Sequence, residues 1–284
     1  MNTVAGVGGS LLRASPAQVA KINIPLPPLA EQQKIAAILD AVDQLRQKDQ
    51  QLIDHYTQLS QSLFLEMFGD PVTNSKGWSF SPFSESLNDI VGGKSVGGEE
   101  RPLRPNEKAV IKISAVTSGV FNSTKCKVVK GSDIPDVMVH PRKGDLLFSR
   151  ANTREMVGAT CIVDATYKNL FLPDKIWRLD LNSDMACNWY IKFLLSYDGF
   201  RENLRKVATG TSGSMLNISK AKLKQLKVLL PPIDLQNQFA QHIEKIEQQK
   251  QQAQASLEKS QALFNSLLQR AFKGELTSHK TRAA

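Results

Sequence analysis

Apolar side chains recur at alternating spacings of three and four residues along two long stretches of the chain, 29–70 and 229–276. This spacing, sustained over about four heptads, predicts coiled-coil helices. Each helix is predicted to run about 40 residues without an internal Gly or Pro, or about 60 Å. The first apolar seam consists of Ile35, Ile38, Val42, Leu45, Leu52, Tyr56, Leu59 and Leu63 and is interrupted by Asp49. The second, weaker seam consists of Ile243, Ile246, Lys250, Ala253, Leu257, Ser260, Phe264, Leu267 and Ala271.

These stretches belong to an internal repeat with an offset of 204 residues, in which Pro27-Pro28-Leu29 matches Pro231-Pro232-Ile233 and Gln32 matches Gln236. In each copy a short apolar run (22–26 and 226–230) is predicted to be a strand, because the Pro-Pro pair that follows cannot continue a ladder. Two such helices entering and leaving one domain pair most simply as an antiparallel stalk on a globular head. The alternative is two separate amphipathic helices packed on that head.

The segment between the helices, 71–228, mixes strand-like and helical patterns. We assign it to the α+β class, with a strongly curved mixed sheet. The predicted strands are 109–113, 137–139, 145–148, 159–163 and 176–181, and the predicted helices are 188–196 and 199–207. Glycine-rich turns at 91–98 and 209–213 separate these elements.

Positive charge is concentrated in this middle segment, which has 24 Lys and Arg against 15 Asp and Glu, in a chain of net charge +9. Such asymmetry favours a polyanionic partner, with chance asymmetry as the alternative. No apolar stretch is long enough for a membrane helix, and the first residues lack the pattern of a signal peptide. Three widely spaced cysteines predict neither a disulfide framework nor a zinc site. We therefore expect a cytoplasmic protein without a bound metal.

No catalytic motif emerges from the sequence. Gly93-Lys94-Ser95 resembles the end of a P-loop, but the first glycine of that motif would fall at position 88, which is Asn88. The four histidines are scattered, and the Asn/Asp-Pro-Pro-Tyr/Phe tetrapeptide of adenine methyltransferases is missing. A carboxylate-metal cluster typical of nucleases is missing too. We expect the chain not to be an enzyme by itself.

The loops of the middle segment do carry groups suited to reading DNA. Arg grips guanine and Asn grips adenine in a bidentate manner, whereas Ser and Thr hydroxyls reach bases or phosphates. The alternatives are surface ion pairs for Arg150 and Arg154 and a turn for Asn152. The candidate DNA-binding residues are Lys94, Ser95, Arg101, Arg104, Ser149, Arg150, Asn152, Thr153, Arg154, Thr211, Ser212, Ser214 and Lys220.

The chain resembles the specificity subunits of type I restriction-modification systems. The resemblance rests on IPLPPLAEQQKIAAILD, on SLFLEMFGDP followed by KGW, and on ISAVTSG, KGDLLFSRANTREMVGA, PDKIWRL and GTSGSMLNISKAKL in the middle segment. These motifs stand in the family's order over nearly the whole chain. The family has two target recognition domains separated by paired helices, whereas this chain carries one, so it resembles a half-length form.

The resemblance implies five segments: a remnant of a missing recognition domain (1–28), a spacer helix (29–70), a target recognition domain (71–228), a second spacer helix (229–276) and a disordered tail (277–284). It also implies the partners, namely double-stranded DNA, modification subunits and restriction/translocase subunits, with a second copy of the chain as a further candidate. No cofactor is expected in this chain, and S-adenosylmethionine is expected in the modification subunit. The candidate subunit contacts, with a coiled-coil core role as the alternative, are Phe64, Met67, Phe68 and Phe264.

The function expected from this resemblance is to read one half of a bipartite DNA site and so direct adenine methylation and restriction. The competing hypothesis is a basic coiled-coil adaptor that does not read DNA sequence. The adaptor hypothesis explains the helices but not the duplicated linker or the loops rich in Gly, Ser, Arg and Asn.

Overall fold

A computed structural model describes residues 4–5, 13–24, 26–210 and 215–276 of the 284-residue chain. The predicted tail 277–284, residues 1–3, 6–12 and 25 of the predicted remnant 1–28, and the candidates Thr211, Ser212 and Ser214 lie outside these residues. The chain forms two compact units. The helical unit comprises Met1–His55 and Gln249–Ala284, and the α+β unit comprises Tyr56–Gln248.

Two helices of 40 residues each, α2 (Leu29–Phe68) and α6 (Ile233–Phe272), confirm the long helices predicted from the heptads. Both begin directly after the Pro-Pro pair of the repeat. The side-chain amide of Gln32 donates to the Pro27 carbonyl at 2.7 Å, and that of Gln236 donates to the Pro231 carbonyl at 2.7 Å. The repeated Gln therefore makes the same hydrogen bond at the start of each helix.

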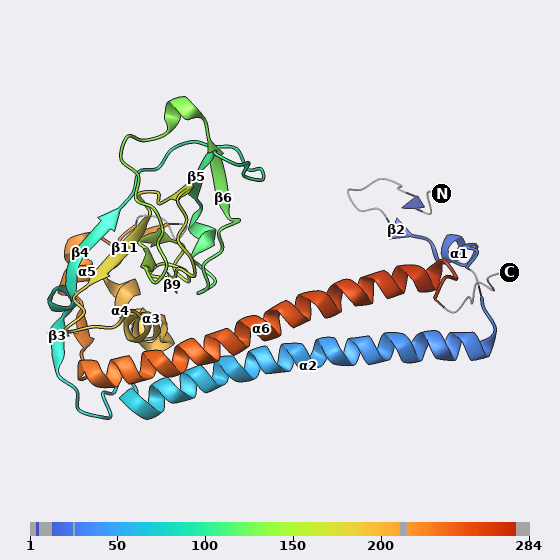
Figure 1. Cartoon of the computed structure of the whole chain (residues 1–284), viewed down its shortest axis with the longest axis horizontal. Coiled ribbons are helices and arrows are strands. Elements are labelled where there is room, and N and C mark those ends of the chain that lie inside the picture. The colour runs from blue at the N-terminus through green and yellow to red at the C-terminus, as the bar shows by residue number, and fades with distance from the viewer. Residues whose placement is uncertain (1–3, 6–12, 25, 211–214, 277–284) are drawn as a thin grey trace. The chain divides into compact units, whose positions relative to one another are not determined.

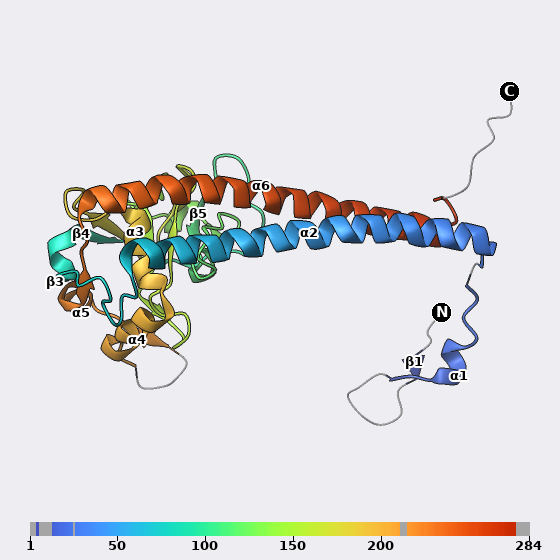
Figure 2. The same ribbon diagram turned by 90° about the horizontal axis from the view of Figure 1, so that it is seen from below.

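Within the helical unit the two helices lie side by side and antiparallel, as Figures 1 and 2 show. Arg46 of α2 donates to Gln261 of α6 at 2.8 Å, while Asp49, three residues later in α2, accepts from Ser256 earlier in α6 at 3.1 Å. The predicted antiparallel pairing is thereby confirmed. This unit also holds β1 (Val4–Ala5), which pairs with β2 (Arg13–Ala14), and the short helix α1 (Pro16–Val19).

The side of α2 that faces α6 differs from the predicted seam. Val42 and Ile53 are buried, whereas Ile38, Leu45 and Leu52 are 38%, 53% and 46% exposed. The row 35/42/49/56 of α2 can face a partner helix together with either of two neighbouring rows. These rows are 38/45/52/59 and 39/46/53/60, and a heptad pattern does not decide which of them is the inner one. The residues of α6 that face α2 include the small residues Ala253 and Ser260. They leave room between the helices for the polar side chains of Arg46 and Asp49.

Two sheets organise the α+β unit. One has the order β4-β11-β7-β9, with all pairs antiparallel, and the other has the order β10-β5-β6, in which β10 and β5 are parallel. Two further pairs, β13-β3 and β12-β8, complete the unit. The strands are β3 (Phe80–Pro82), β4 (Leu87–Gly92), β5 (Lys108–Ile111), β6 (Cys126–Val129), β7 (Leu146–Ser149), β8 (Ala151–Asn152), β9 (Thr160–Ile162), β10 (Leu170–Phe171), β11 (Ile176–Leu181), β12 (Leu216–Asn217) and β13 (Lys227–Leu229).

The main core of this unit joins the sheet to the helices. The helices α3 (Asn188–Ser196), α4 (Asp198–Val207) and α5 (Lys220–Gln225) contribute to it, and so do the ends of α2 and α6. Phe64 and Phe68 are each 2% exposed, and the Phe68 ring lies 4.7 Å from that of Tyr190 and 5.2 Å from that of Phe239. The prediction that Phe64 and Phe68 contact another subunit is therefore wrong, because both rings are enclosed by this chain's own core.

The other two residues predicted to contact a partner, Met67 and Phe264, also make contacts within this chain. Met67 is half-buried against the same core. Phe264 lies in the helical unit, where the Arg46 guanidinium stands 5.0 Å from its ring centre. The core role that the sequence left open is thus the observed one for these apolar groups.

The α+β class is confirmed, and most predicted elements are present. β5, β7, β9, β11, β13, α3 and α4 all fall on predicted segments. Residues 137–139 are not a strand, because they lie between Pro135 and Pro141 and Val137 is 81% exposed. The described residues of 22–26 are not a strand either, and Ile24 is 69% exposed. Within the described part of the chain, no helix is both long and apolar enough to span a membrane.

Candidate nucleic-acid interface

Three loops meet at one edge of the four-stranded sheet. In the ladder, Ser149 at the end of β7 is opposite Ile176 at the start of β11, and Trp177 is opposite Gly92 at the end of β4. The segments that follow β4 and β7 and the segment that precedes β11 therefore lie side by side. This register brings together Ser95, Arg150 and Asp174, which are far apart in the sequence.

Arg150 is held by Asp174 in a fixed orientation. Its Nε donates to the Asp174 backbone carbonyl at 2.9 Å, and its Nη2 donates to the Asp174 carboxylate at 3.3 Å. The guanidinium also lies 5.5 Å from the centre of the Trp177 ring, which stacks on Phe148 at 6.1 Å. Arg150 is thus neither a free surface cation nor a buried one, since its side chain is 27% exposed.

The Asp174 carboxylate is held from a second side by Ser95, whose hydroxyl donates to it. Burial opposes ionisation of this carboxyl, but the hydrogen bonds from Ser95 and Arg150 outweigh that effect and lower its pKa. The loop reaches this position by passing very close to the chain before β11. A Cβ added at Gly93 would lie 1.8 Å from the Leu172 carbonyl oxygen, so glycine is required there.

A fourth segment reaches the same edge. Asn152 in β8 pairs with Leu216 in β12, and the Ile218 amide donates to the Arg150 carbonyl at 2.8 Å. Nearby, the Lys220 ammonium donates to the Ile90 carbonyl in β4. The glycine-rich segment 209–217 is thus anchored beside Arg150 at its described C-terminal end.

The candidate residues differ in what they can reach. The side chains of Lys94, Ser95, Arg104, Thr153 and Arg154 are exposed, and Arg154 makes a long ion pair with Glu202 at 3.5 Å. Asn152 is half-buried, and its side-chain oxygen accepts from the Thr153 amide at 2.8 Å, which is the turn-forming role that the sequence left open.

Two candidates do not fit a direct contact with DNA. Ser149 is fully buried in β7, the strand between β11 and β9, so its selection as a DNA contact is wrong. Arg101 makes two hydrogen bonds of 2.8 Å to the Glu107 carboxylate and another of 3.2 Å to Glu99. Its fork is therefore occupied within its own loop, and the prediction of DNA contact is corrected to a loop-stabilising role. The sequence does not reveal this pairing, because a basic side chain in a glycine-rich loop fits either role.

The clearest residues that the sequence analysis missed are Asp174 and Trp177. Both lie in the PDKIWRL motif, but a carboxylate is not an obvious ligand for a polyanion, and the tryptophan fits a core strand equally well. The sequence indicated Asp174 only as an acidic residue shortly before a buried strand. The role of Asp174 depends on the strand register, in which the Arg150 amide donates to the carbonyl of the neighbouring Lys175.

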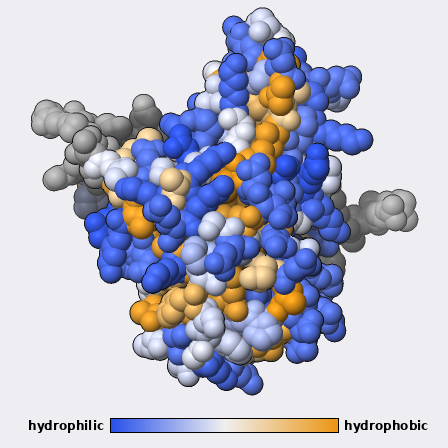
Figure 3. All heavy atoms as spheres, turned by 90° about the vertical axis from the view of Figure 1, so that its left-hand side faces the viewer, coloured by the Kyte–Doolittle hydropathy of each residue, from blue (hydrophilic) through white to orange (hydrophobic). Residues whose placement is uncertain are grey.

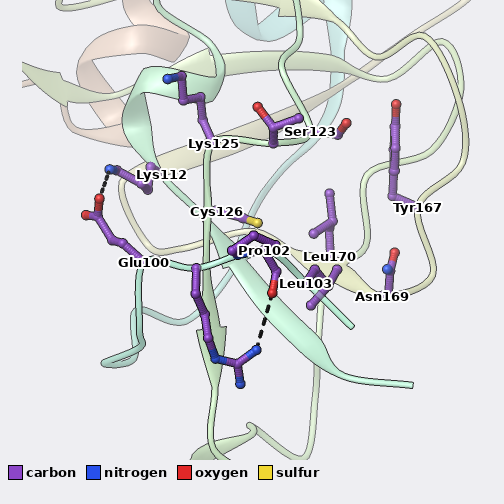
Figure 4. Close-up of a pocket in the computed structure, with 12 residues that line it drawn as sticks. Glu100, Pro102, Leu103, Lys112, Ser123, Lys125, Cys126, Tyr167, Asn169 and Leu170 are labelled. Carbon is purple, nitrogen blue, oxygen red and sulfur yellow. Dashed lines mark hydrogen bonds and ion pairs between the residues drawn. The ribbon is translucent and has the colours of Figure 1, made fainter. Parts of the chain in front are cut away.

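A hollow of about 610 Å³ lies beside the three-stranded sheet. Figure 4 shows the Lys112 ammonium turned to Glu100 on one side, with a separation of 2.8 Å, and Tyr167 and Asn169 on the other side around Cys126. Burial raises the pKa of the Cys126 thiol, which disfavours the reactive thiolate. The described residues contain no group of three His, Cys, Asp or Glu placed to hold a metal.

Figure 3 shows one face of the molecule, on which hydrophilic side chains predominate and apolar side chains form bands and patches between them. The candidate edge thus combines a fixed guanidinium, a carboxylate, hydroxyls and lysines. Such an arrangement suits hydrogen bonding to a polar, anionic ligand rather than burial of an apolar one.

Comparisons of the sequence with known proteins find relatives of the chain. A family model described as the type I restriction modification DNA specificity domain matches residues 3–55. The chain is 29% identical over 294 residues to the EcoKI specificity subunit of Escherichia coli (strain K12), which covers 95% of this chain and 61% of that subunit. It is 30% identical over 170 residues to the Escherichia coli EcoEI specificity subunit, which covers 59% of this chain and 28% of that protein. The chain thus spans at most about three fifths of the length of these relatives.

Solved structures agree in fold. The type I restriction-modification S subunit of M. genitalium matches 94% of this chain and 67% of its own at a TM-score of 0.58 and 14% identity. A chain from a structure of complex assembly in a type I R-M system matches 95% of this chain and 66% of its own at a TM-score of 0.55 and 21% identity. The sequence matches confirm the resemblance that the motifs predicted, and the chain is similar in sequence and in fold to the specificity subunits of type I restriction-modification systems.

Proposed function

We propose that this chain is the DNA-reading subunit of a type I restriction-modification complex and that its segment 71–228 reads one half of a bipartite site. The observation that carries the proposal is the meeting of Ser95 after β4, Arg150 after β7 and the segment of β12 at one edge of the sheet. Three loops from distant parts of the sequence present hydrogen-bonding groups together, which is what reading several base edges requires.

In this proposal the chain itself performs no chemistry. It binds double-stranded DNA, while modification subunits that bind S-adenosylmethionine methylate an adenine and restriction/translocase subunits cleave unmodified DNA. A base must leave the duplex to be methylated, so the reading subunit serves to place the correct adenine beside the methyltransferase. A cytoplasmic location follows from these partners and is part of the proposal.

The subunit contact is proposed for the outward row of α2 instead of the phenylalanines. Ile38, Leu45 and Leu52 follow one another at seven-residue spacing and are exposed within the helical unit. Apolar residues at heptad spacing on an exposed face suit an amphipathic partner helix. We propose a helix of the modification subunit as the occupant, with a second copy of this chain as the alternative. Paired Leu45→Ser and Leu52→Ser substitutions should weaken co-purification with that subunit, and analytical ultracentrifugation of the chain alone distinguishes the second copy.

The test of the proposed function is a genome-wide map of methylated adenines in a host that expresses this chain with its modification subunit. A new split motif supports the proposal. A symmetric, interrupted palindrome indicates two copies of the chain, because the symmetry of the protein is mirrored in its site, and an asymmetric motif indicates a second reading chain. A soluble complex that adds no methylation and shows no sequence preference in binding would contradict the proposal and favour the adaptor.

A further inference from the structure

Arg150 is built into the sheet edge more rigidly than an exposed arginine needs to be. Its guanidinium lies above Trp177, and Trp177 is 5% exposed and stacked on the fully buried Phe148. Asp174 fixes the guanidinium from the side through a backbone carbonyl and a carboxylate oxygen. An exposed ion pair by itself contributes little to stability, so stability alone does not account for this amount of support.

The pattern of hydrogen bonds leaves part of the guanidinium available. A guanidinium has five N–H groups, and Asp174 takes the one on Nε and one on Nη2. No acceptor within the described part of the chain takes the N–H groups on Nη1. The remaining groups on Nη1 and Nη2 form the fork that binds the O6 and N7 atoms of guanine.

We propose that Asp174 is a positioning residue that holds Arg150 as a reader of one guanine edge in the major groove. The inference deepens the proposed function and rests on it. Held on two sides, the guanidinium cannot turn freely to follow a phosphate, so its remaining fork meets a base with a fixed direction. Ser95 supports this arrangement, because its hydroxyl donates to the Asp174 carboxylate oxygen that Arg150 does not contact.

The charge of Asp174 predicts an effect on DNA binding that a purely structural ion pair would not produce. A carboxylate at a DNA-facing edge repels the phosphates and lowers affinity for every sequence. The Asp174 carboxyl is ionised at neutral pH, and the hydrogen bonds from Ser95 and Arg150 lower its pKa further. Removal of the charge should therefore raise affinity for unrelated DNA while lowering discrimination at one base pair. Loss of a structural support would instead lower affinity for all sequences.

The experiment compares Asp174→Asn with the wild-type chain in complex with its modification subunit. We measure binding to the mapped site, to site variants with each base pair changed, and to random duplex, and we map the methylated motif. The expected result is a loss of about tenfold or more in preference for guanine at a single position, with unchanged or tighter binding to random duplex. Arg150→Ala should lose preference at the same position, and Ser95→Ala should lose part of it.

Asp145 provides the matched control. Its carboxylate lies 3.7 Å from the Arg178 guanidinium in the same sheet, and the two side chains are 17% and 20% exposed. Asp145→Asn should leave both the methylated motif and the preference at every base pair unchanged, because this carboxylate does not contact Arg150 in the described structure. If the wild-type complex shows no sequence preference, the proposed function fails and the inference fails with it. If the wild-type complex does show a preference but Asp174→Asn leaves every position unchanged, the inference alone is overturned.

Discussion

The Asp49 carboxylate of α2 accepts a hydrogen bond of 3.1 Å from the Ser260 hydroxyl of α6. Ser256 donates to the same carboxylate oxygen at 3.1 Å. The residue that interrupts the apolar seam in the sequence is therefore a specific polar contact between the two helices. A polar residue at one interior position of a coiled coil fixes register, because every shifted pairing leaves it without its partners.

Asp49→Ala should lower the free energy of unfolding by about 1–2 kcal/mol, since it removes the acceptor of two hydroxyls and Ser260 is 9% exposed. Asp54→Ala is the control, because Asp54 accepts only a hydrogen bond of 3.0 Å from Gln50 of its own helix in the described contacts. We expect a change within about 0.5 kcal/mol for this control. Urea unfolding followed by circular dichroism measures both, and equal effects would contradict the interhelical role of Asp49.

Phe68→Ala should lower the free energy of unfolding by about 3–5 kcal/mol, the cost of emptying a ring-sized space in a packed core. Leu52→Ser is its counterpart on the exposed row and should stay within about 0.5 kcal/mol. The sequence placed Leu52 in the interhelical seam and Phe68 among the subunit contacts, and these expected effects are the reverse of those roles. Thermal unfolding decides between them, and a stable Phe68→Ala variant with a weakened subunit complex would restore the original assignment.

Gly93→Ala should destabilise the loop that carries Ser95, because its Cβ would lie 1.8 Å from a backbone oxygen that has little room to move. The expected cost is about 1–3 kcal/mol, together with a reduced sequence preference in DNA binding. Gly97→Ala in the same loop is the control, since its Cβ would meet nothing within 4 Å. Hydrogen exchange over 90–98 compares the two, and equal protection in both variants would count against the close approach.

The Glu107 carboxyl should stay ionised far into the acidic range. The hydrogen bonds from the Arg101 guanidinium, followed by the Arg104 amide, stabilise its charged form and lower its pKa to about 2. Because the pKa is lower in the folded state, this interaction stabilises the fold above the usual pKa of about 4.3 and is lost as the pH falls through about 2. Carbon NMR of the carboxyl should be flat from pH 7 to pH 4, and Arg101→Gln should restore titration in that range.

Thiol reactivity tests the placement of the cysteines. Burial raises the pKa of Cys161 to about 12, and its side chain is fully enclosed. Cys126 is also buried, whereas Cys187 is half-exposed. An alkylating reagent at pH 8 should therefore label Cys187 first, as read by mass spectrometry of the intact and digested chain. Early labelling of Cys161 would contradict the burial of its side chain.

Much of the fold could be predicted from local patterns. The helix limits followed from the Pro-Pro pairs and from the absence of Gly and Pro between Leu29 and Phe68, and the strands 145–148 and 176–181 followed from short apolar runs. The strand predicted at 137–139 failed because apolar residues between two prolines make such a run without a ladder partner. Short strands such as β8 and β12 were missed, since two residues carry no period and form only where a partner segment arrives.

The sequence predicted the type of side chain at the candidate site but not which of these side chains are available to a ligand. Arg150 and Ser95 were identified by the chemistry of their side chains, and the structure brings both to one sheet edge. Ser149 and Arg101 carry the same chemistry, but one is enclosed in a strand and the other is occupied by Glu107. Whether a polar side chain is available to a ligand depends on its neighbours in space, and those neighbours are distant in the sequence.

The sequence by itself determined the long helices, the duplicated linker with its repeated Gln32 and Gln236, and the α+β class of the segment between them. These features are local, because each depends on residues within a few turns of one another. The tertiary structure alone decided which row of α2 faces α6, which phenylalanines became core, and that Asp174 holds Arg150. Each of these depends on strand register and helix rotation, which are set by packing between distant segments rather than by the pattern along one of them.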